Sequence, residues 1–374
     1  MHRRGIHLQY SFGPDDQRGA DVHNPLFDLL LAVEQHGSIR HAADALGASY
    51  RHVWGQLKQW EGQLGEALVS WTQGQPARLT PFAARLLWAE RRARTRLTPH
   101  IEALRAELER VLTDAFDGSQ QVLALAASHD LALPALRQLA SAQRGLHVEL
   151  RFAGSIDCLG ALSQGRCLVA GFHVPRLADG SAVFARALKP LLTPGRHKLI
   201  GCMRRRQGVM VAPGNPLGVE GVADLPRLRF VNRPLGSGTR VLMDHLLDVH
   251  GIAPGAVAGY LEAPGEDSHV AVAAAVASGL ADAGAGIQAA AAQFGLGFVP
   301  LIEEDYFLAS LKESLEHPAV QELCALLASP AWAEAPNALA GYTPMRGGEV
   351  LSLTQALPWW HFRRAKAAPK ASAR

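Results

Sequence analysis

Hydroxyl, imidazole and guanidinium side chains recur in the later two thirds of the chain, where predicted strands give way to predicted helices. They occur at Ser128-His129, Ser155, Ser237 to Arg240, and Ser268-His269. Free N–H groups and a partial positive charge at helix N-termini favour anions. In open α/β sheets the strand ends also converge on one crevice. The pattern therefore predicts a binding site for a small anion.

Catalytic and metal-binding motifs are missing from the sequence. It contains no GxSxG, HExxH or GxxxxGK[ST] motif, so we do not expect an enzyme. Its cysteines form no CxxC pair and have no metal-ligand spacing, which predicts free thiols in a reducing compartment: Cys158, Cys167, Cys202 and Cys324. We expect no catalytic residue, no metal and no cofactor.

A second set of donors lies between Gly37 and Gly65. Ser38 and Ser49 are predicted to cap two helices separated by a turn at Gly47. The core-facing side of the second helix carries Val53, Leu57, Trp60 and Leu64. Its other face carries donors and stacking groups suited to base edges in a major groove: Tyr50, Arg51, His52, Gln56 and Gln59.

Two short apolar-polar runs flank Gly74-Gln75-Pro76 and predict a hairpin wing. Arg78, on the returning strand, is expected to touch phosphate. The net charge is only +3, so affinity for DNA would depend on local placement of cations. The predicted DNA-contacting residues are Ser38, Arg40, Ser49, Tyr50, Arg51, His52, Gln56 and Arg78.

A long helix is predicted over residues 81–113, with Pro99 kinking or splitting it. Its arginines form either a solvated face or contacts to flanking phosphates: Arg91, Arg92, Arg94 and Arg96. Strands such as QVLALAA, LHVELRF, CLVAGF and RLRFVN then alternate with helices, which predicts a largely parallel sheet flanked by helices. The absence of a signal peptide and of a long apolar run predicts a soluble, cytoplasmic protein.

The segment of residues 27–87 resembles the N-terminal domain of LysR-type regulators. The match includes Gly37-Ser38 followed by Ala42-Ala43, the segment from Trp60-Glu61 to Leu64-Gly65, and Leu79-Thr80. Trp54 departs from the usual small polar residue, and Ser49-Tyr50 with Trp54 is closer to the ModE-type regulators. This resemblance implies that the long helix forms dimer contacts and that a homodimer or homotetramer binds an inverted-repeat operator in double-stranded DNA.

The region of about residues 120–350, in which strands alternate with helices, resembles type II periplasmic-binding-protein domains. The resemblance lies in the segments SHDLAL, GSGTR and SGLADAGAGI. The resemblance implies two lobes with a ligand between them. The ligand-binding residues that it implies are Ser128, His129, Ser155, His173, Ser237, Thr239, Arg240 and His269. Each hydroxyl at a helix start has an alternative role as a cap. Arg240 has an alternative role in bracing the hinge or pairing with Asp244.

The predicted fold is multidomain: an all-α winged helix-turn-helix with a long linker helix, then an α/β two-lobed periplasmic-binding-protein-like domain. The predicted boundaries are 22–80 for the winged helix-turn-helix, 81–118 for the linker helix, 119–350 for the ligand-binding domain and 351–374 for a C-terminal tail.

The predicted function is ligand-responsive regulation of transcription, with DNA affinity set by closure of the two lobes. The expected effector is a small anion, either molybdate or tungstate or a small carboxylate such as formate, and the controlled genes would be related to molybdenum enzymes. The alternative function is storage or delivery of molybdenum or another oxyanion without regulation of DNA.

Overall fold

The computed structural model describes residues 24–71, 76–116, 121–177, 182–262 and 265–360. They fall into two compact units. The first unit runs to Glu90 and includes His100–Arg105, and the second holds Arg91–Pro99 and everything from Ala106 onwards. Helix α4 (Pro81–Phe116) contributes to both units. None of the described helices is long and apolar enough to cross a membrane.

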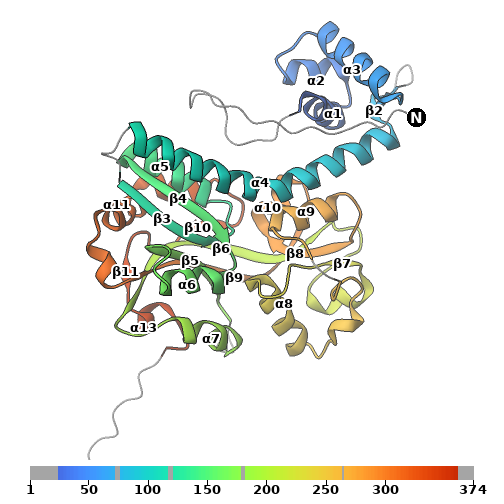
Figure 1. The fold of residues 1–374 in the computed structure, drawn as a ribbon. Helices are drawn as coiled ribbons and strands as arrows, with labels where there is room; N and C mark the ends of the chain where they lie inside the picture. Colours follow the sequence, from blue (N-terminus) through green and yellow to red (C-terminus); the bar gives the residue numbers. More distant parts are fainter. Residues whose placement is uncertain (1–23, 72–75, 117–120, 178–181, 263–264, 361–374) are drawn as a thin grey trace, which may run out of the picture. The chain divides into compact units, whose positions relative to one another are not determined.

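The first unit contains three helices and a short antiparallel hairpin, followed by the start of α4 (Figure 1). The helix boundaries follow from local capping. Asn24 Oδ1 accepts from Leu26 N, and Ser38 and Ser49 each accept from the backbone N–H three residues later. Gly37 and Gly65 end their helices in the left-handed region, at φ 59° and 74°. The elements are α1 (Pro25–His36), α2 (Ile39–Ala45), α3 (Tyr50–Leu64), β1 (Val69–Ser70) and β2 (Arg78–Leu79).

The apolar face of α3 lies in the core of the first unit, as the sequence pattern predicted. Val53 and Leu57 are fully buried, and Trp60 and Leu64 pack half-buried against the same core. The end of α3 is tied to β1 through Glu61, whose Oε1 accepts from Leu68 N at 2.9 Å and whose Oε2 pairs with Lys58 Nζ at 2.6 Å. The predicted hairpin is present, but Gly74 and Gln75 lie outside the described residues.

Helix α4 is a single helix of 36 residues that continues through Pro99. Of the two outcomes predicted at Pro99, a kink or a split, the split is not observed. Proline removes the one N–H that would bond to the Thr95 carbonyl, and a helix of this length keeps its remaining hydrogen bonds on both sides. Side chains on the turn before Pro99 also bond to the backbone: Thr95 Oγ1 donates to Arg91 O and Thr98 Oγ1 to Arg94 O.

The second unit is built on one nine-stranded mixed sheet with the order β4-β3-β5-β9-β6-β8-β7, and β10 and β11 pair with β6. Strand β3 is parallel to β4 and β5, and β7 is parallel to β8. The strands are β3 (Gln121–Ser128), β4 (Leu146–Ala153), β5 (Val169–Pro175), β6 (His197–Val211), β7 (Phe230–Val231), β8 (Ala283–Ile287), β9 (Gly297–Leu311), β10 (Tyr342–Pro344) and β11 (Val350–Leu351).

Two antiparallel strands of 15 residues each, β6 and β9, run through both halves of this sheet (Figure 1). The C-terminal half of β9 pairs with β5, and the C-terminal half of β6 pairs with β8. The alternation of strands and helices predicted a largely parallel sheet, and this prediction is wrong, because the pairs of β6 and β9 are antiparallel. Both long strands are antiparallel to the strands beside them. The alternation of short strands with helices predicts parallel neighbours and therefore does not describe these two strands.

Helices cover both faces of the sheet. Leu133 and Leu136 of α5 share one core with α11 and α12, while Cys158 and Leu159 of α6 share another with α7 and α13. The helices are α5 (Leu133–Arg144), α6 (Ser155–Ser163), α7 (Ala182–Leu188), α8 (Gly238–Val249), α9 (His269–Ala277), α10 (Gln288–Gln293), α11 (Pro318–Leu327), α12 (Pro330–Asn337) and α13 (Leu353–Ala356). Short 3₁₀ helices are η1 (Lys189–Leu191), η2 (Val222–Arg227), η3 (Pro254–Ala256) and η4 (Glu313–Glu316).

The folded part of the second unit extends past the expected boundary at residue 350. Leu351, Leu353, Leu357 and Trp359 are buried in the core beneath α6 and α7. The apolar residues of this segment therefore belong to the domain and not to a tail. The basic segment from Arg363 to Arg374 lies outside the described residues. The observed architecture confirms the predicted class, a helical helix-turn-helix unit followed by an α/β unit.

Candidate functional site

The outer face of α3 presents the side chains that the sequence assigned to DNA. We call Tyr50, Arg51, His52 and Gln56 the recognition face. The first three are exposed and Gln56 is half-buried. Ser49 caps the helix beneath them, and its Oγ accepts from His52 N at 3.2 Å. The N-terminal half of α3 therefore offers donors and one aromatic ring to solvent.

Aromatic contacts join the recognition face to the hairpin. Tyr50 stacks on Trp54 with ring centroids 6.2 Å apart, and Trp54 meets Trp71 edge-on at 5.0 Å. Lys58 Nζ lies 4.8 Å from the Trp54 ring centroid and 5.4 Å from that of Trp71. This explains why a large residue is accommodated at position 54, where the LysR-type pattern has a small one: it fills the space between α3 and β1.

The other predicted DNA-contacting residues lie on the surface of the same unit. Arg40 is exposed on α2 and Arg78 is exposed on β2 opposite Ser70. Ser38 is half-buried and acts as the cap of α2. Within the described part of the chain, no ion pair joins Arg40, Arg51 or Arg78 to an acid, so their guanidinium groups are available to phosphate or bases.

A group of polar and charged side chains gathers in the second unit around the middle of the paired strands β6 and β9. We call it the buried polar cluster. Its members lie at or just after the ends of two strands, in the middle of three strands and at the starts of two helices. They are Ser128, Asp130, Ser155, His173, Arg205, Arg233, His269 and Glu304, which are buried, and His129, which is half-buried.

Arg205, in the middle of β6, is the centre of this cluster and is fully buried. Its Nη1 donates to Asp130 Oδ2 at 2.7 Å and its Nε to Glu304 Oε2 at 3.0 Å. Tyr342 Oη also donates to Asp130 Oδ2, at 2.8 Å. Burial alone would lower the pKa of Arg205, but Glu304 and Asp130 raise it above its ordinary value. Arg205 is therefore a fixed cation with its charge compensated.

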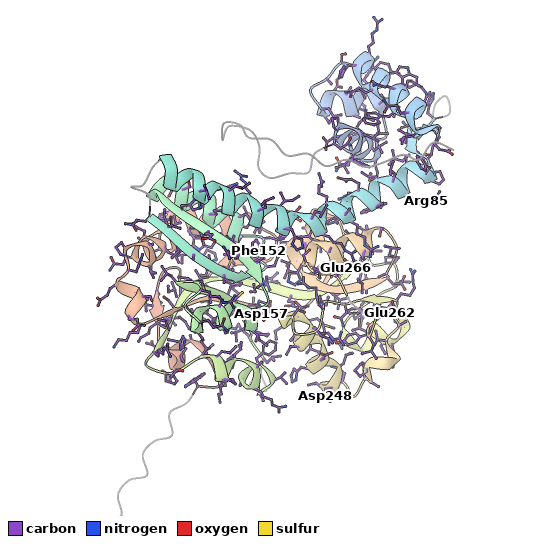
Figure 2. The ribbon with its side chains drawn as sticks, viewed as in Figure 1. Arg85, Phe152, Asp157, Asp248, Glu262 and Glu266 are labelled. Carbon is purple, nitrogen blue, oxygen red and sulfur yellow. The ribbon has the colours of Figure 1, made fainter. Side chains whose placement is uncertain are left out.

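Three histidines lie close to Arg205 and Arg233, and all three are neutral at ordinary pH. Burial, together with the two arginines, lowers the pKa of His129 to about 3 and holds those of His173 and His269 well below 6.5. Ser128 Oγ and His173 Nδ1 are 3.2 Å apart. The ring of His129 packs on that of Phe152, with centroids 4.9 Å apart. Phe152, which is labelled in Figure 2, lies near the end of β4.

Arg233 differs from Arg205 because its side chain has no compensating hydrogen bond. It is only 8% exposed, and its Nε and Nη1 have no hydrogen-bond partner among the described residues. Burial and the charge of Arg205 lower its pKa to about 10, against the attraction of Asp267 and Glu266. A buried donor without a partner is unfavourable by about 1–3 kcal/mol, and more when charged, so Arg233 is suited to receive an anion.

Other buried atoms of the cluster share this property. They are His129 Nδ1, Ser155 Oγ, His173 Nε2, Arg205 Nη2 and His269 Nδ1, none of which has a hydrogen-bond partner within the described ranges. The hydroxyl, guanidinium and tautomeric imidazole groups can all donate to an oxyanion. The described residues contain no group of three or more His, Cys, Asp or Glu arranged to hold a metal ion.

The structure brings Ser128, His129, His173 and His269 together. Ser155 begins α6, immediately after β4, whose Ala153 is in register with Ser128. Thr239 contributes indirectly: with the Gln207 amide oriented to satisfy its neighbours, Thr239 Oγ1 donates to Gln207, which donates to Glu304.

Ser237 and Arg240 have structural roles. Ser237 Oγ caps α8 by accepting from Arg240 N at 3.2 Å. Arg240 Nε donates to Asp244 at 2.8 Å and its guanidinium lies over the Tyr260 ring at 4.6 Å. The alternative of a pair with Asp244 is the one observed. The guanidinium groups that the structure places in the buried polar cluster are those of Arg205 and Arg233, and not that of Arg240.

Arg233 had a signal in the sequence, whereas Arg205 and Glu304 had little. Arg233 directly follows the RLRFVN strand, the same strand-end position that selected Ser128 and Ser155. Arg205 and Glu304 lie in the middle of β6 and β9. A mid-strand charge becomes recognisable as a site residue only when the pairing of those strands is known.

Family comparisons agree with this architecture. Residues 26–84 match the family described as bacterial regulatory helix-turn-helix protein, LysR family, and residues 136–328 match the PBP superfamily domain. The uncharacterized protein YvgK of Bacillus subtilis (strain 168) is 37% identical over 166 residues, which are 44% of this chain. The chain spans about half, 53%, of the length of that relative.

Solved structures of full-length regulators are similar at low identity. A hydrogen-peroxide-bound OxyR mutant from Corynebacterium glutamicum is 17% identical with a TM-score of 0.43, covering 83% of this chain and 92% of that one. Full-length BenM is 18% identical with a TM-score of 0.40, covering 80% and 94%. CbnR complexed with its target DNA is 17% identical with a TM-score of 0.39, covering 80% and 98%.

The helix-turn-helix match is to regulators and not to enzymes, as the missing catalytic motifs predicted. The second match covers more than half of the chain. The chain therefore belongs to the PBP superfamily through its second domain and carries a LysR-family helix-turn-helix segment before it.

Proposed function

We propose that this protein is a LysR-type DNA-binding transcriptional regulator, that it binds a small anion at the buried polar cluster, and that the bound anion changes its affinity for DNA. The observation that carries the proposal is the uncompensated guanidinium of Arg233 beside the unpartnered nitrogens of His129, His173 and His269. Burial and then the charges of the two arginines lower the histidine pKa values. An anion would satisfy the unpartnered donors and offset the positive charge of the arginines. A ligand enclosed by side chains this buried must be small.

Molybdate or tungstate is the proposed effector class. A tetrahedral oxyanion can accept hydrogen bonds from several directions, which matches donors that come from β3, α6, α9 and the segment after β7. Formate is the smaller carboxylate alternative, because one guanidinium can bind it in a bidentate manner. Control of molybdenum-enzyme genes by such an effector in the cytoplasm follows from this proposal.

Calorimetric titration with molybdate, tungstate, formate and sulfate tests the effector. We expect heat from at least one of the first three, and loss of that heat in Arg233→Met. Arg240→Met is the matched control, because it removes a buried arginine from the same unit that does not contact the cluster. Absence of heat from every anion, or equal loss in both variants, would overturn the proposed site.

We also propose that the recognition face enters a major groove while Arg78 contacts the backbone. The supporting observations are the exposure of Tyr50, Arg51 and His52 and the fixed position of the hairpin beside them. An electrophoretic shift on the DNA upstream of its own gene tests this. A protein that binds an anion but shifts no DNA would instead be the storage or delivery protein.

The proposed operator is an inverted repeat, because α4 carries exposed apolar side chains suited to pair with a second copy. Leu104 is 48% exposed and Val111 57% exposed. Pairing of such helices would give a homodimer, or a homotetramer by further contacts, with two recognition faces related by two-fold symmetry. Light scattering gives the oligomeric state, and footprinting gives the spacing of the half-sites.

A further inference from the structure

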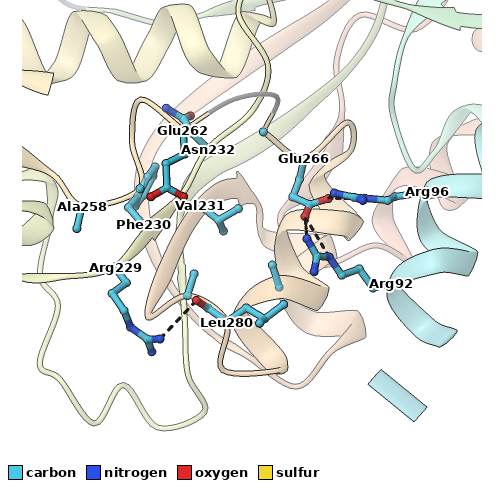
Figure 3. Close-up of a pocket in the computed structure, with 14 residues that line it drawn as sticks. Arg92, Arg96, Arg229, Phe230, Val231, Asn232, Ala258, Glu262, Glu266 and Leu280 are labelled. Atoms are coloured by element: carbon cyan, nitrogen blue, oxygen red, sulfur yellow. Dashed lines mark hydrogen bonds and ion pairs between the residues drawn. The ribbon is translucent and has the colours of Figure 1, made fainter. Parts of the chain in front are cut away.

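Two arginines on α4 bind one buried carboxylate of the second unit (Figure 3). Arg92 donates to Glu266 Oε1 from Nε at 3.2 Å and from Nη2 at 2.7 Å, and Arg96 Nε donates to Glu266 Oε2 at 2.9 Å. The Glu266 side chain is only 3% exposed, so both of its oxygens depend on α4 for compensation. These residues line a pocket of about 340 Å³.

Glu266 is also locked to the segment that carries Arg233. Its backbone N–H donates to Asn232 O at 2.9 Å, and Asn232 Oδ1 accepts from Arg233 N at 2.9 Å. Gly265 adopts a φ of +78°, and a Cβ there would lie 2.9 Å from the Arg233 carbonyl carbon. Only glycine allows this approach of the two backbones. The backbone around Arg233 is therefore in direct contact with the backbone around Glu266.

A second connection leads from Glu266 to His269. Ser268 caps α9 by accepting from Ala271 N at 3.1 Å, and His269 is the first residue of that helix. Glu266 thus lies two residues before a cap whose helix begins with a member of the buried polar cluster. The segment from Gly265 to His269 thus contacts Arg233 at its first residue and ends at His269, and both are proposed ligand-binding residues. Between them, Glu266 pairs with the two arginines of α4.

We propose that Glu266 is the positioning residue that couples the buried polar cluster to α4, and through α4 to DNA binding. This inference rests on the proposed function of the cluster. A ligand that pulls on Arg233 or His269 would move Glu266 and with it the pair of arginines on α4. Coupling requires that the two states differ in affinity for each ligand, and it is reciprocal between the two sites.

The test compares Glu266→Gln and the double variant Arg92→Gln/Arg96→Gln with Glu262→Gln in the full-length protein. Glu262 lines the same pocket, and no described residue of α4 forms an ion pair with it. The measured quantity is the ratio of DNA affinities with and without saturating molybdate. We expect the ratio to fall below about twofold in the first two variants, from a wild-type value of about fivefold or more.

Molybdate affinity without DNA separates coupling from a merely structural role. We expect it to stay within about threefold of wild type in Glu266→Gln, because every side chain of the cluster is retained and only the attraction between the charges of Glu266 and Arg233 is lost. Glu262→Gln should retain the full ratio. A wild-type ratio in Glu266→Gln and in the arginine double variant would overturn the inference.

A second measurement decides the case in which no molybdate binds and the proposed function fails. Hydrogen exchange of the amides from Glu266 to Ala271 is followed with and without the upstream DNA. We expect DNA to change this exchange in wild type and in Glu262→Gln but not in Glu266→Gln. The same response in all three proteins, or no response in wild type, would overturn the coupling independently of the effector.

Discussion

The recognition face of the first unit and the buried polar cluster of the second use similar side chains under opposite conditions. Arg51 and His52 are exposed, and consecutive residues of one short helix place them. Arg205 and His173 are buried, and strands far apart in the chain bring them together. An exposed site tolerates cations without partners, whereas a buried one must compensate each charge or leave it for a ligand. Substitution of single residues should therefore affect mainly DNA binding at the recognition face, and mainly stability or anion binding at the buried polar cluster.

Replacement of Arg205 should have the largest effect of any single change. Arg205→Met leaves Asp130 and Glu304 buried without their cation, which we expect to lower the free energy of unfolding by about 3–5 kcal/mol. Arg233→Met should lower it by less than about 1 kcal/mol, since the Arg233 side chain has no hydrogen bond to lose among the described residues. Denaturant titration of both variants measures this, and equal losses would remove the distinction between a structural and a ligand-binding arginine.

Acid pH should weaken the second unit through the histidines. The pKa of His129 is lowered to about 3 in the folded protein, so below pH 6.5 the unfolded chain takes up a proton that the folded chain does not. Stability is then lost as pH falls from 6.5 towards 3, by about 2 kcal/mol for His129 between pH 7 and pH 5.

Comparison of wild type with His129→Gln isolates this contribution, because Glu304, whose pKa is raised by burial, is common to both proteins. The variant should lose less stability than wild type over the same range in denaturant titrations. Identical pH profiles would mean that His129 is protonated in the folded protein.

Arg51→Ala should reduce affinity for the upstream DNA by about tenfold, which is the effect of losing one base or phosphate contact. The exposed position predicts almost no change in unfolding free energy. Arg166→Ala, which removes an exposed arginine from the second unit, is the charge-matched control for fluorescence-anisotropy titrations. Equal losses in both variants would indicate an effect of net charge and not of the recognition face.

The smallest expected effect concerns the ring contact between Trp54 and Trp71. A double-mutant cycle with Trp54→Ala and Trp71→Ala should give a coupling of about 0.5–1.5 kcal/mol in unfolding free energy, the range for an edge-on aromatic pair. Additive effects would show that the rings touch without stabilising each other, and that other contacts fix the hairpin.

The comparison of the two regions also explains how far the sequence could predict the molecule. The helix-turn-helix depends on caps such as Ser38 and Ser49 and on the spacing of Val53 and Leu57, all of which are local. In the second unit, strand ends such as Ser128 could be recognised. Arg205 and Glu304 are 99 positions apart in the chain, and their contact depends on the antiparallel register of β6 and β9, which local spacing does not encode.

The long strands β6 and β9 impose a mechanical consequence on the second unit. Their pairing register shifts at Gly201/Met203 and again at Gln207/Gly208, on either side of Arg205. Interrupted pairing makes a strand easier to bend at those points than between them. If the two halves of the sheet move relative to each other, we expect β6 and β9 to bend at these two positions. Arg205 would then lie on the short segment between the two bend points, and its ion pairs with Glu304 and Asp130 would hold that segment to β9 and to the end of β3.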